Sequence, residues 1–197
     1  MNILHLDNSP RGDASLSRRL SAYLAEQLKG ETHTYRDLAN SPFPQLAAED
    51  LVAIHGSTGQ GTAALASHLA ISDTLIAELK QADALIIGTP MHNFTIPAVL
   101  KRWIDYIGRA GLTFKYTENG PVGLTGIKTA YIILATGGAP VGGDWDFASG
   151  YLTHICKFFG VETVHVIDAG GSKREPEKII ARAKARIDEL VQEQVMV

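Results

Sequence analysis

The segment ALIIGTPMHNF, residues 84–94, decides the fold that we predict for this sequence. It begins with a short apolar run that ends at Thr89-Pro90, and such a run is typical of a strand buried on both faces. The next four residues are too polar and too irregular to continue that strand. After Pro97, which suits the first turn of a helix, apolar residues recur with helical spacing at Leu100, Trp103, Ile104 and Ile107. The segment therefore predicts a strand, a tight loop and a helix.

The rest of the chain repeats this alternation of strand and helix. We expect further strands at residues 3–6, 32–38, 128–135 and 162–168, and helices at residues 16–28, 65–79, 147–159 and 176–191. Residues 39–62 and 110–125 are expected to be irregular. The alternation predicts a parallel sheet with helices on both faces. The expected fold is α/β, a flavodoxin-like three-layer sandwich with five strands in the order 2-1-3-4-5, and residues 1–197 form one domain.

Composition excludes several classes of protein. The net charge is −3 and charges of both signs are mixed along the chain, so we expect neither nucleic acid nor a membrane surface as a partner. The single cysteine, Cys156, excludes an internal disulfide, and no Cys/His spacing suggests a metal site. No stretch reaches the roughly 18 apolar residues of a membrane span. The amino terminus is too short and acid-ended for a signal peptide, and we expect a cytoplasmic protein.

The loop after the first strand is predicted to bind an anion. In the expected order, strands 1, 3 and 4 are neighbours, and ligands bind at the carboxyl ends of such strands. Residues 9–17 contain one glycine, so they match neither dinucleotide-binding nor P-loop motifs. Ser9, Ser15 and Ser17 lead into a helix start, where hydroxyls and backbone N–H groups suit a phosphate monoester. Alternatively, Ser15 is only an N-cap and Ser17 only a first-turn residue.

The loops after strands 3 and 4 offer a different chemistry. Met91 and Phe94 can pack against a planar ring, and Asn93 can both donate and accept hydrogen bonds. Alternatively, residues 90–94 form a simple turn with Phe94 in the core. Gly137 and Gly138 allow a close approach of the backbone to a ligand, although two glycines after a strand are also common in plain turns.

These residues resemble those of the FMN-dependent NADH:quinone oxidoreductases, also called FMN-dependent NADH-azoreductases. The resemblance runs nearly from end to end of the chain. It lies in the spacing of Ser9, Ser15 and Ser17, in PMxNF at residues 90–94 and in the glycine pair 137–138. It also covers RDLA at 36–39, SDTLIAELK at 72–80 and RAGLTFKYTENGPVGL at 109–124.

The resemblance implies a flavodoxin-like homodimer with one FMN per subunit and an active site between the subunits. The phosphate is expected at Ser9, Ser15, Leu16 and Ser17. The isoalloxazine ring is expected against Pro90, Met91, His92, Asn93, Phe94, Ala135, Thr136, Gly137 and Gly138. The partner subunit is expected to supply Tyr116 and Phe158 or Phe159 to the substrate pocket. Trp145 is expected to cover the ring, or else to be an ordinary surface tryptophan.

Two positions differ from many members of that family. His92 stands where many have tyrosine, and Ala135-Thr136 stands where many have a Ser-Arg pair. Because both lie beside the expected ring, we expect them to affect substrate range and flavin potential more than FMN binding. His92 is the candidate for an acid or base, because histidine titrates near neutrality. The alternative is a half-exposed loop histidine. Cys156 lies on an apolar helix face and is expected to be buried packing.

The activity implied by the resemblance is a ping-pong reaction. NADH or NADPH reduces the flavin, and a quinone then takes two electrons to give a hydroquinone; an azo compound needs two such rounds. One alternative is an NADPH-dependent FMN or chromate-type reductase. A second, of a different class, is a flavodoxin-like electron carrier, although a net charge of −3 is mild for that role.

Overall fold

A central parallel sheet organises the molecule. The computed structural model describes residues 1–41, 43–55, 63–171 and 175–195. Within these residues, five strands form one sheet in the order β2-β1-β3-β6-β7. The strands are β1 (Asn2–Asp7), β2 (Thr32–Asp37), β3 (Ala84–Pro90), β6 (Thr129–Ala135) and β7 (Thr163–Ala169). Every adjacent pair is parallel. The organising strand β3 lies at the centre with six of its seven residues buried, as its apolar run predicts.

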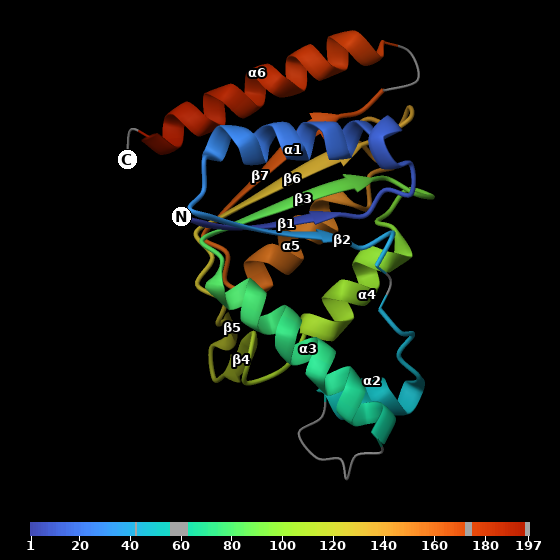
Figure 1. The fold of residues 1–197 in the computed structure, drawn as a ribbon, viewed down its shortest axis with the longest axis vertical. Helices are drawn as coiled ribbons and strands as arrows, with labels where there is room; N and C mark the ends of the chain where they lie inside the picture. Colours follow the sequence, from blue (N-terminus) through green and yellow to red (C-terminus); the bar gives the residue numbers. More distant parts are fainter. Residues whose placement is uncertain (42, 56–62, 172–174, 196–197) are drawn as a thin grey trace.

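Helices cover both faces of this sheet (Figure 1). On one face lie α1 (Leu16–Leu28) and α6 (Pro176–Val195). On the other lie α3 (Ala63–Gln81), α4 (Ala98–Ile107) and α5 (Ser149–Phe158). Each face has its own buried apolar cluster, so the strands contribute alternate side chains to two cores. The three-layer α/β sandwich expected from the sequence is confirmed. None of the helices in the described residues is both long and apolar enough to cross a membrane.

The stretch 110–125 was wrongly expected to be irregular. It contains a hairpin of β4 (Phe114–Thr117) and β5 (Gly120–Gly123), paired antiparallel and separate from the main sheet. The sequence concealed this hairpin because all of its side chains except Phe114 are exposed or half-buried, so no apolar alternation marks its strands. The hairpin strands take the numbers 4 and 5. For this reason the sheet order is written 2-1-3-6-7 where the sequence led us to write 2-1-3-4-5.

Two helices also differ from expectation. Within 39–62, a short helix α2 (Ala48–His55) replaces part of the expected irregular stretch, and residues 56–62 lie outside the described residues. Helix α5 begins at Ser149 and not at Phe147, where the sequence predicted its start. The carboxylate of Asp146 accepts hydrogen bonds from the N–H groups of Ala148 (2.8 Å) and Ser149 (2.9 Å) and so fixes the start of the helix.

The topology brings three loops to one edge of the sheet. Asp7 at the end of β1 lies opposite Gly88 in β3, and Pro90 at the end of β3 lies opposite Ala135 at the end of β6. The loops that follow these three strands are therefore neighbours. This edge is the position where open α/β sheets bind ligands.

Candidate functional site

The loop after β1 presents hydroxyls at the start of α1. Ser15 is the N-cap of α1, and its Oγ accepts a hydrogen bond from the Arg18 N–H at 3.4 Å. Its Oγ also lies 3.1 Å from that of Ser17. The side chains of Ser9, Ser15 and Ser17 are all at most 3% exposed. Leu16 and Ser17 occupy the first turn, where backbone N–H groups have no partner within the helix. The N-cap role is thus confirmed, and it leaves donors aimed at the space in front of the helix.

The loop after β3 is held in an uncommon backbone conformation. Asn93 and Phe94 have φ angles of 48° and 71°, in the left-handed region that is costly for residues other than glycine. Reciprocal hydrogen bonds between the backbones of His92 and Thr95 close the turn at 2.9 and 3.1 Å. The interpretation that Phe94 lies in the core is wrong, because this side chain is 50% exposed. His92 is also exposed. The loop therefore turns its side chains outward from the strand end.

The loop after β6 joins the first two through the backbone. The Met91 N–H donates to the carbonyl oxygen of Ala135 at 2.8 Å, which ties the end of β3 to the end of β6. Thr136 is buried, and its hydroxyl donates to the carbonyl oxygen of Ala139. A Cβ placed on Gly138 meets no protein atom within 4 Å. Protein packing thus does not require a glycine here, which leaves room for a ligand against the backbone.

Exposed aromatic side chains gather beside these loops. Phe94 and Trp145 lie edge to face with their ring centroids 5.8 Å apart, and Trp145 is 65% exposed. Phe147 is equally exposed, and its N–H donates to the carbonyl oxygen of Phe94 at 3.0 Å. These three exposed aromatic side chains form an apolar border beside the three loops.

Tyr116 and Phe158 lie elsewhere in this chain. They border a groove of about 380 Å³ between α4, α5 and the hairpin. Figure 1 shows the hairpin below the sheet, toward the amino ends of its strands and away from the three loops. Phe159 lines the same groove, but it is only 5% exposed and packs mostly in the core. Within one chain, the structure therefore does not bring these residues to the loops.

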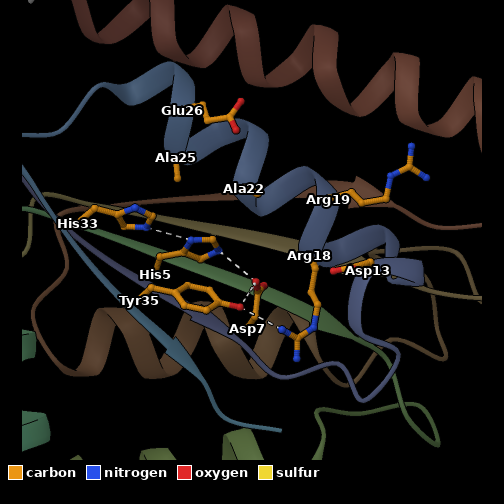
Figure 2. A pocket seen from close by; sticks show the side chains of 10 residues that line it. All are labelled: His5, Asp7, Asp13, Arg18, Arg19, Ala22, Ala25, Glu26, His33 and Tyr35. Atoms are coloured by element: carbon orange, nitrogen blue, oxygen red, sulfur yellow. Dashed lines mark hydrogen bonds and ion pairs between the residues drawn. The ribbon is translucent and has the colours of Figure 1, made fainter. Parts of the chain in front are cut away.

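A polar network behind the first loop was not found from the sequence. Some of its side chains, among them Asp7, Arg18 and Tyr35, line a cavity of about 520 Å³ between α1 and strands β1 and β2 (Figure 2). The Arg18 guanidinium donates to both carboxylate oxygens of Asp37, at 2.6 and 2.7 Å. These bonds hold the pKa of Asp37 at about 2. One available signal was a basic residue in the first turn of a helix, where the macrodipole disfavours it.

The network continues inward to a buried carboxylate. Asp7 is 2% exposed and accepts hydrogen bonds from the hydroxyls of Ser21 (2.8 Å) and Tyr35 (3.2 Å). Burial, followed by the charge of Asp7, raises the pKa of the Tyr35 hydroxyl to about 12. His5 lies 3.4 Å from Asp7 and stacks on His33. The first loop is thus backed by a continuous set of polar side chains.

A cysteine nucleophile and a metal ion are two other chemistries that a site could use. Cys156 is buried, and burial raises the pKa of its thiol to about 12, so it is packing and not a nucleophile. Among the residues that the structure describes, no three His, Cys, Asp or Glu side chains are grouped to hold a metal ion.

Comparisons with known proteins agree on one family. The family model described as flavodoxin-like fold matches residues 1–191. The chain is 42% identical to FMN-dependent NADH:quinone oxidoreductase 1 of Jannaschia sp. (strain CCS1), covering 96% of this chain and 98% of that one. It is also 42% identical to FMN-dependent NADH:quinone oxidoreductase 2 of Pseudomonas aeruginosa, with 95% and 96% covered.

Solved structures give the same result. Azoreductase AzrA matches with a TM-score of 0.85 and 29% identity, over 98% of this chain and all of that one. An FMN-dependent NADH-azoreductase from Bacillus anthracis, in complex with FMN, matches with a TM-score of 0.84 and 26% identity, over 98% and 99%. The chain therefore belongs to the FMN-dependent NADH:quinone oxidoreductase family, within the flavodoxin-like fold.

Proposed function

We propose that this protein is an FMN-dependent NADH:quinone oxidoreductase that also cleaves aromatic azo compounds. The observation that carries the proposal is the meeting of three loops at one sheet edge, one rich in buried hydroxyls and two with accessible backbone. The names of the relatives and of the FMN-bound azoreductase support it.

The first loop has the donor set that a phosphate monoester requires. The buried hydroxyls of Ser9, Ser15 and Ser17 stand around the N-terminus of α1, where backbone N–H groups and the helix dipole favour an anion. A phosphate placed there needs no positively charged side chain in contact with it. We assign Ser9 and residues 15–17 to the FMN phosphate.

The other two loops suit a flat, mostly apolar ring with a polar edge. Residues 90–94 and 135–138 supply backbone groups at the ends of two adjacent strands, and Gly138 leaves space at the protein surface. Backbone N–H groups near Gly137 and Gly138 can stabilise negative charge on the pyrimidine side of the ring, as donors do in an oxyanion hole. We assign both segments to the isoalloxazine ring.

The protein's own part in the reaction is to position the donor and the acceptor and to exclude water from them. Bound FMN would supply the hydride and two-electron chemistry, and the reduced nicotinamide and the acceptor would occupy the same place in turn. Phe94, Trp145 and Phe147 form the apolar border against which a planar donor or acceptor can stack. We assign no obligatory acid or base, and His92 is the candidate that a variant should test.

A homodimer would complete the site. Tyr116 is 74% exposed, and Phe158 packs on Phe114 with their ring centroids 4.6 Å apart, beside the groove between α4, α5 and the hairpin. Exposed aromatic side chains at a groove are typical of an interface. We propose that this face contacts a second copy and brings Tyr116 and Phe158 to the partner's flavin. The cytoplasm, which supplies reduced nicotinamide, is the compartment that we propose.

The absorption spectrum of the purified protein tests the cofactor. We expect a yellow protein that releases FMN on heating and is bleached by NADH without oxygen. A colourless protein that does not take up added FMN would contradict the proposal. Rates with a quinone, an azo dye, a ferric chelate and free flavin then separate the proposed activity from that of an FMN or chromate-type reductase, and matched titrations compare NADH with NADPH.

A further inference from the structure

Arg18 contacts the loop that we assign to the FMN phosphate, but from behind it. We propose that Arg18 is a positioning residue that fixes the backbone at Ser9, and that Asp37 fixes Arg18, so that the loop is ready for a phosphate. The inference rests on the proposed function and deepens it, because neither residue would touch the cofactor.

The contacts of Arg18 are directed at the main chain of the loop. Its Nε and one terminal nitrogen donate to the carbonyl oxygen of Ser9, at 3.0 and 2.7 Å. The same side chain donates to both carboxylate oxygens of Asp37 and to the hydroxyl of Tyr35. The Arg18 side chain is 11% exposed. A forked guanidinium can bridge a carbonyl and a carboxylate in this way, whereas a lysine ammonium cannot hold both in a fixed geometry.

Asp37 is itself held, so the bridge has a fixed end. Its carboxylate accepts hydrogen bonds from the N–H groups of Ala39 (3.1 Å) and Asn40 (3.2 Å), and from the side-chain amide of Asn40 (2.8 Å). These bonds form the turn that ends β2. Arg18 therefore links the loop after β1 to the turn after β2, and it adds a side-chain bridge to the strand pairing that already places Asp7 opposite Asp37.

Local helix energetics argue against a merely structural role. Arg18 stands in the first turn of α1, where a cation opposes the macrodipole, and the first turn contains no acidic side chain. A neutral or acidic residue would favour the helix itself. The local cost is understandable if the cation instead orders the loop in front of the helix. Pairing with Asp37 neutralises its charge, so its effect on a bound phosphate would be geometric more than coulombic.

The test compares two flavins that differ only in the phosphate. FMN and riboflavin are each titrated into the apoprotein, and flavin fluorescence quenching gives the Kd. For Arg18→Gln and Arg18→Lys, we expect the Kd for FMN to rise about tenfold or more, the scale of one or two hydrogen bonds to a charged group. The Kd for riboflavin should change by less than about twofold, because the ring loops are untouched. Arg19→Gln is the control, since Arg19 lines the same cavity but has no contact with Ser9.

Asp37→Asn separates positioning from charge. It keeps the Arg18 cation but weakens its anchor. Positioning predicts weaker FMN binding, whereas a simple electrostatic effect predicts tighter binding, because a negative charge has been removed. A phosphorus NMR signal of bound FMN that shifts in Arg18→Lys, with an unchanged visible spectrum of the ring, is a second readout that does not depend on riboflavin binding.

The outcomes are distinct. Equal loss of FMN and riboflavin affinity, or tighter FMN binding in Asp37→Asn, would overturn the positioning role. Circular dichroism identifies a variant that fails to fold. If Arg18→Gln does not fold, the conservative variants Arg18→Lys and Asp37→Asn carry the test. If the unaltered protein takes up no FMN, the proposed function fails; if it binds FMN and all Arg18 variants bind it equally well, this inference alone fails.

Discussion

Asp7 on β1 lies directly against Gly88 on β3, so close that a Cβ at residue 88 would stand 2.2 Å from the Asp7 carboxylate. The same Cβ would lie 2.7 Å from the hydroxyl of Ser21 on α1. Only a glycine fits this position, because the buried carboxylate, the hydroxyl and the strand occupy the space completely.

Gly88→Ala should therefore destabilise the fold by about 1–3 kcal/mol, the usual cost of overpacking a filled interior. Urea unfolding of the two proteins measures the difference. Gly150→Ala is a matched control: Gly150 is an exposed position of helix α5, a Cβ there meets no atom within 4 Å, and alanine should be neutral or slightly stabilising. Equal stability of both variants would show that Asp7 can move aside at little cost.

The pair of Arg18 and Asp37 should make stability depend on acid pH. The pKa of Asp37 is about 2 in the folded protein, below the ordinary value of an aspartate, chiefly because Arg18 donates hydrogen bonds to it. A depressed pKa adds stability above the unfolded value and loses it as the pH falls toward the folded one. The melting temperature of the unaltered protein should thus exceed that of Asp37→Asn at pH 7. The gap should close between about pH 4 and pH 2, and a gap that is constant with pH would contradict the assignment.

His92→Ala should change turnover only modestly and leave the FMN in place. His92 is exposed, and its backbone, not its side chain, closes the turn with Thr95. Steady-state rates with NADH and a quinone test this, together with the flavin content of the purified variant. A loss of more than about a hundredfold in kcat, the scale of a general acid or base, would show that the imidazole transfers a proton.

Trp145→Ala should raise the KM for aromatic acceptors and spare the cofactor. Because Trp145 lies edge to face with Phe94 at the border of the three loops, its loss should cost about 0.5–1.5 kcal/mol, or about two- to tenfold in kcat/KM for an aromatic quinone. Ferricyanide offers no aromatic ring and is the matched control acceptor. A proportional loss with both acceptors would mean that Trp145 acts on the flavin and not on the substrate.

Tyr116→Glu should shift the protein from dimer to monomer and lower the quinone reductase rate with it. A charge placed at an apolar interface must be desolvated on association, which opposes dimerisation. Analytical ultracentrifugation measures the shift. Val52→Glu on α2 is the control, because Val52 is 73% exposed and lies away from the groove. A dimer that persists in Tyr116→Glu would place the interface on another face.

The sequence predicted the sheet because its central strands carry their own signal. Residues 84–88 and 130–135 are apolar without interruption, since both faces of β3 and β6 are buried. Hairpin β4–β5 carried no such signal, because most of its side chains face solvent. The loop that we propose for the phosphate was visible as spaced serines near a helix start. Arg18 was not, because its partners, Ser9 and Asp37, are distant in sequence and only the parallel pairing of β1 with β2 brings them together.

The outer strand β2 has a consequence for how these chains can aggregate. An open strand edge is a template on which other chains add by hydrogen bonding, as in amyloid. In β2, four of the six positions are His33, Tyr35, Arg36 and Asp37, and a run so rich in ionisable groups is a poor template. We therefore expect this edge of the sheet to resist fibre growth in the apoprotein as well as in the protein with bound cofactor.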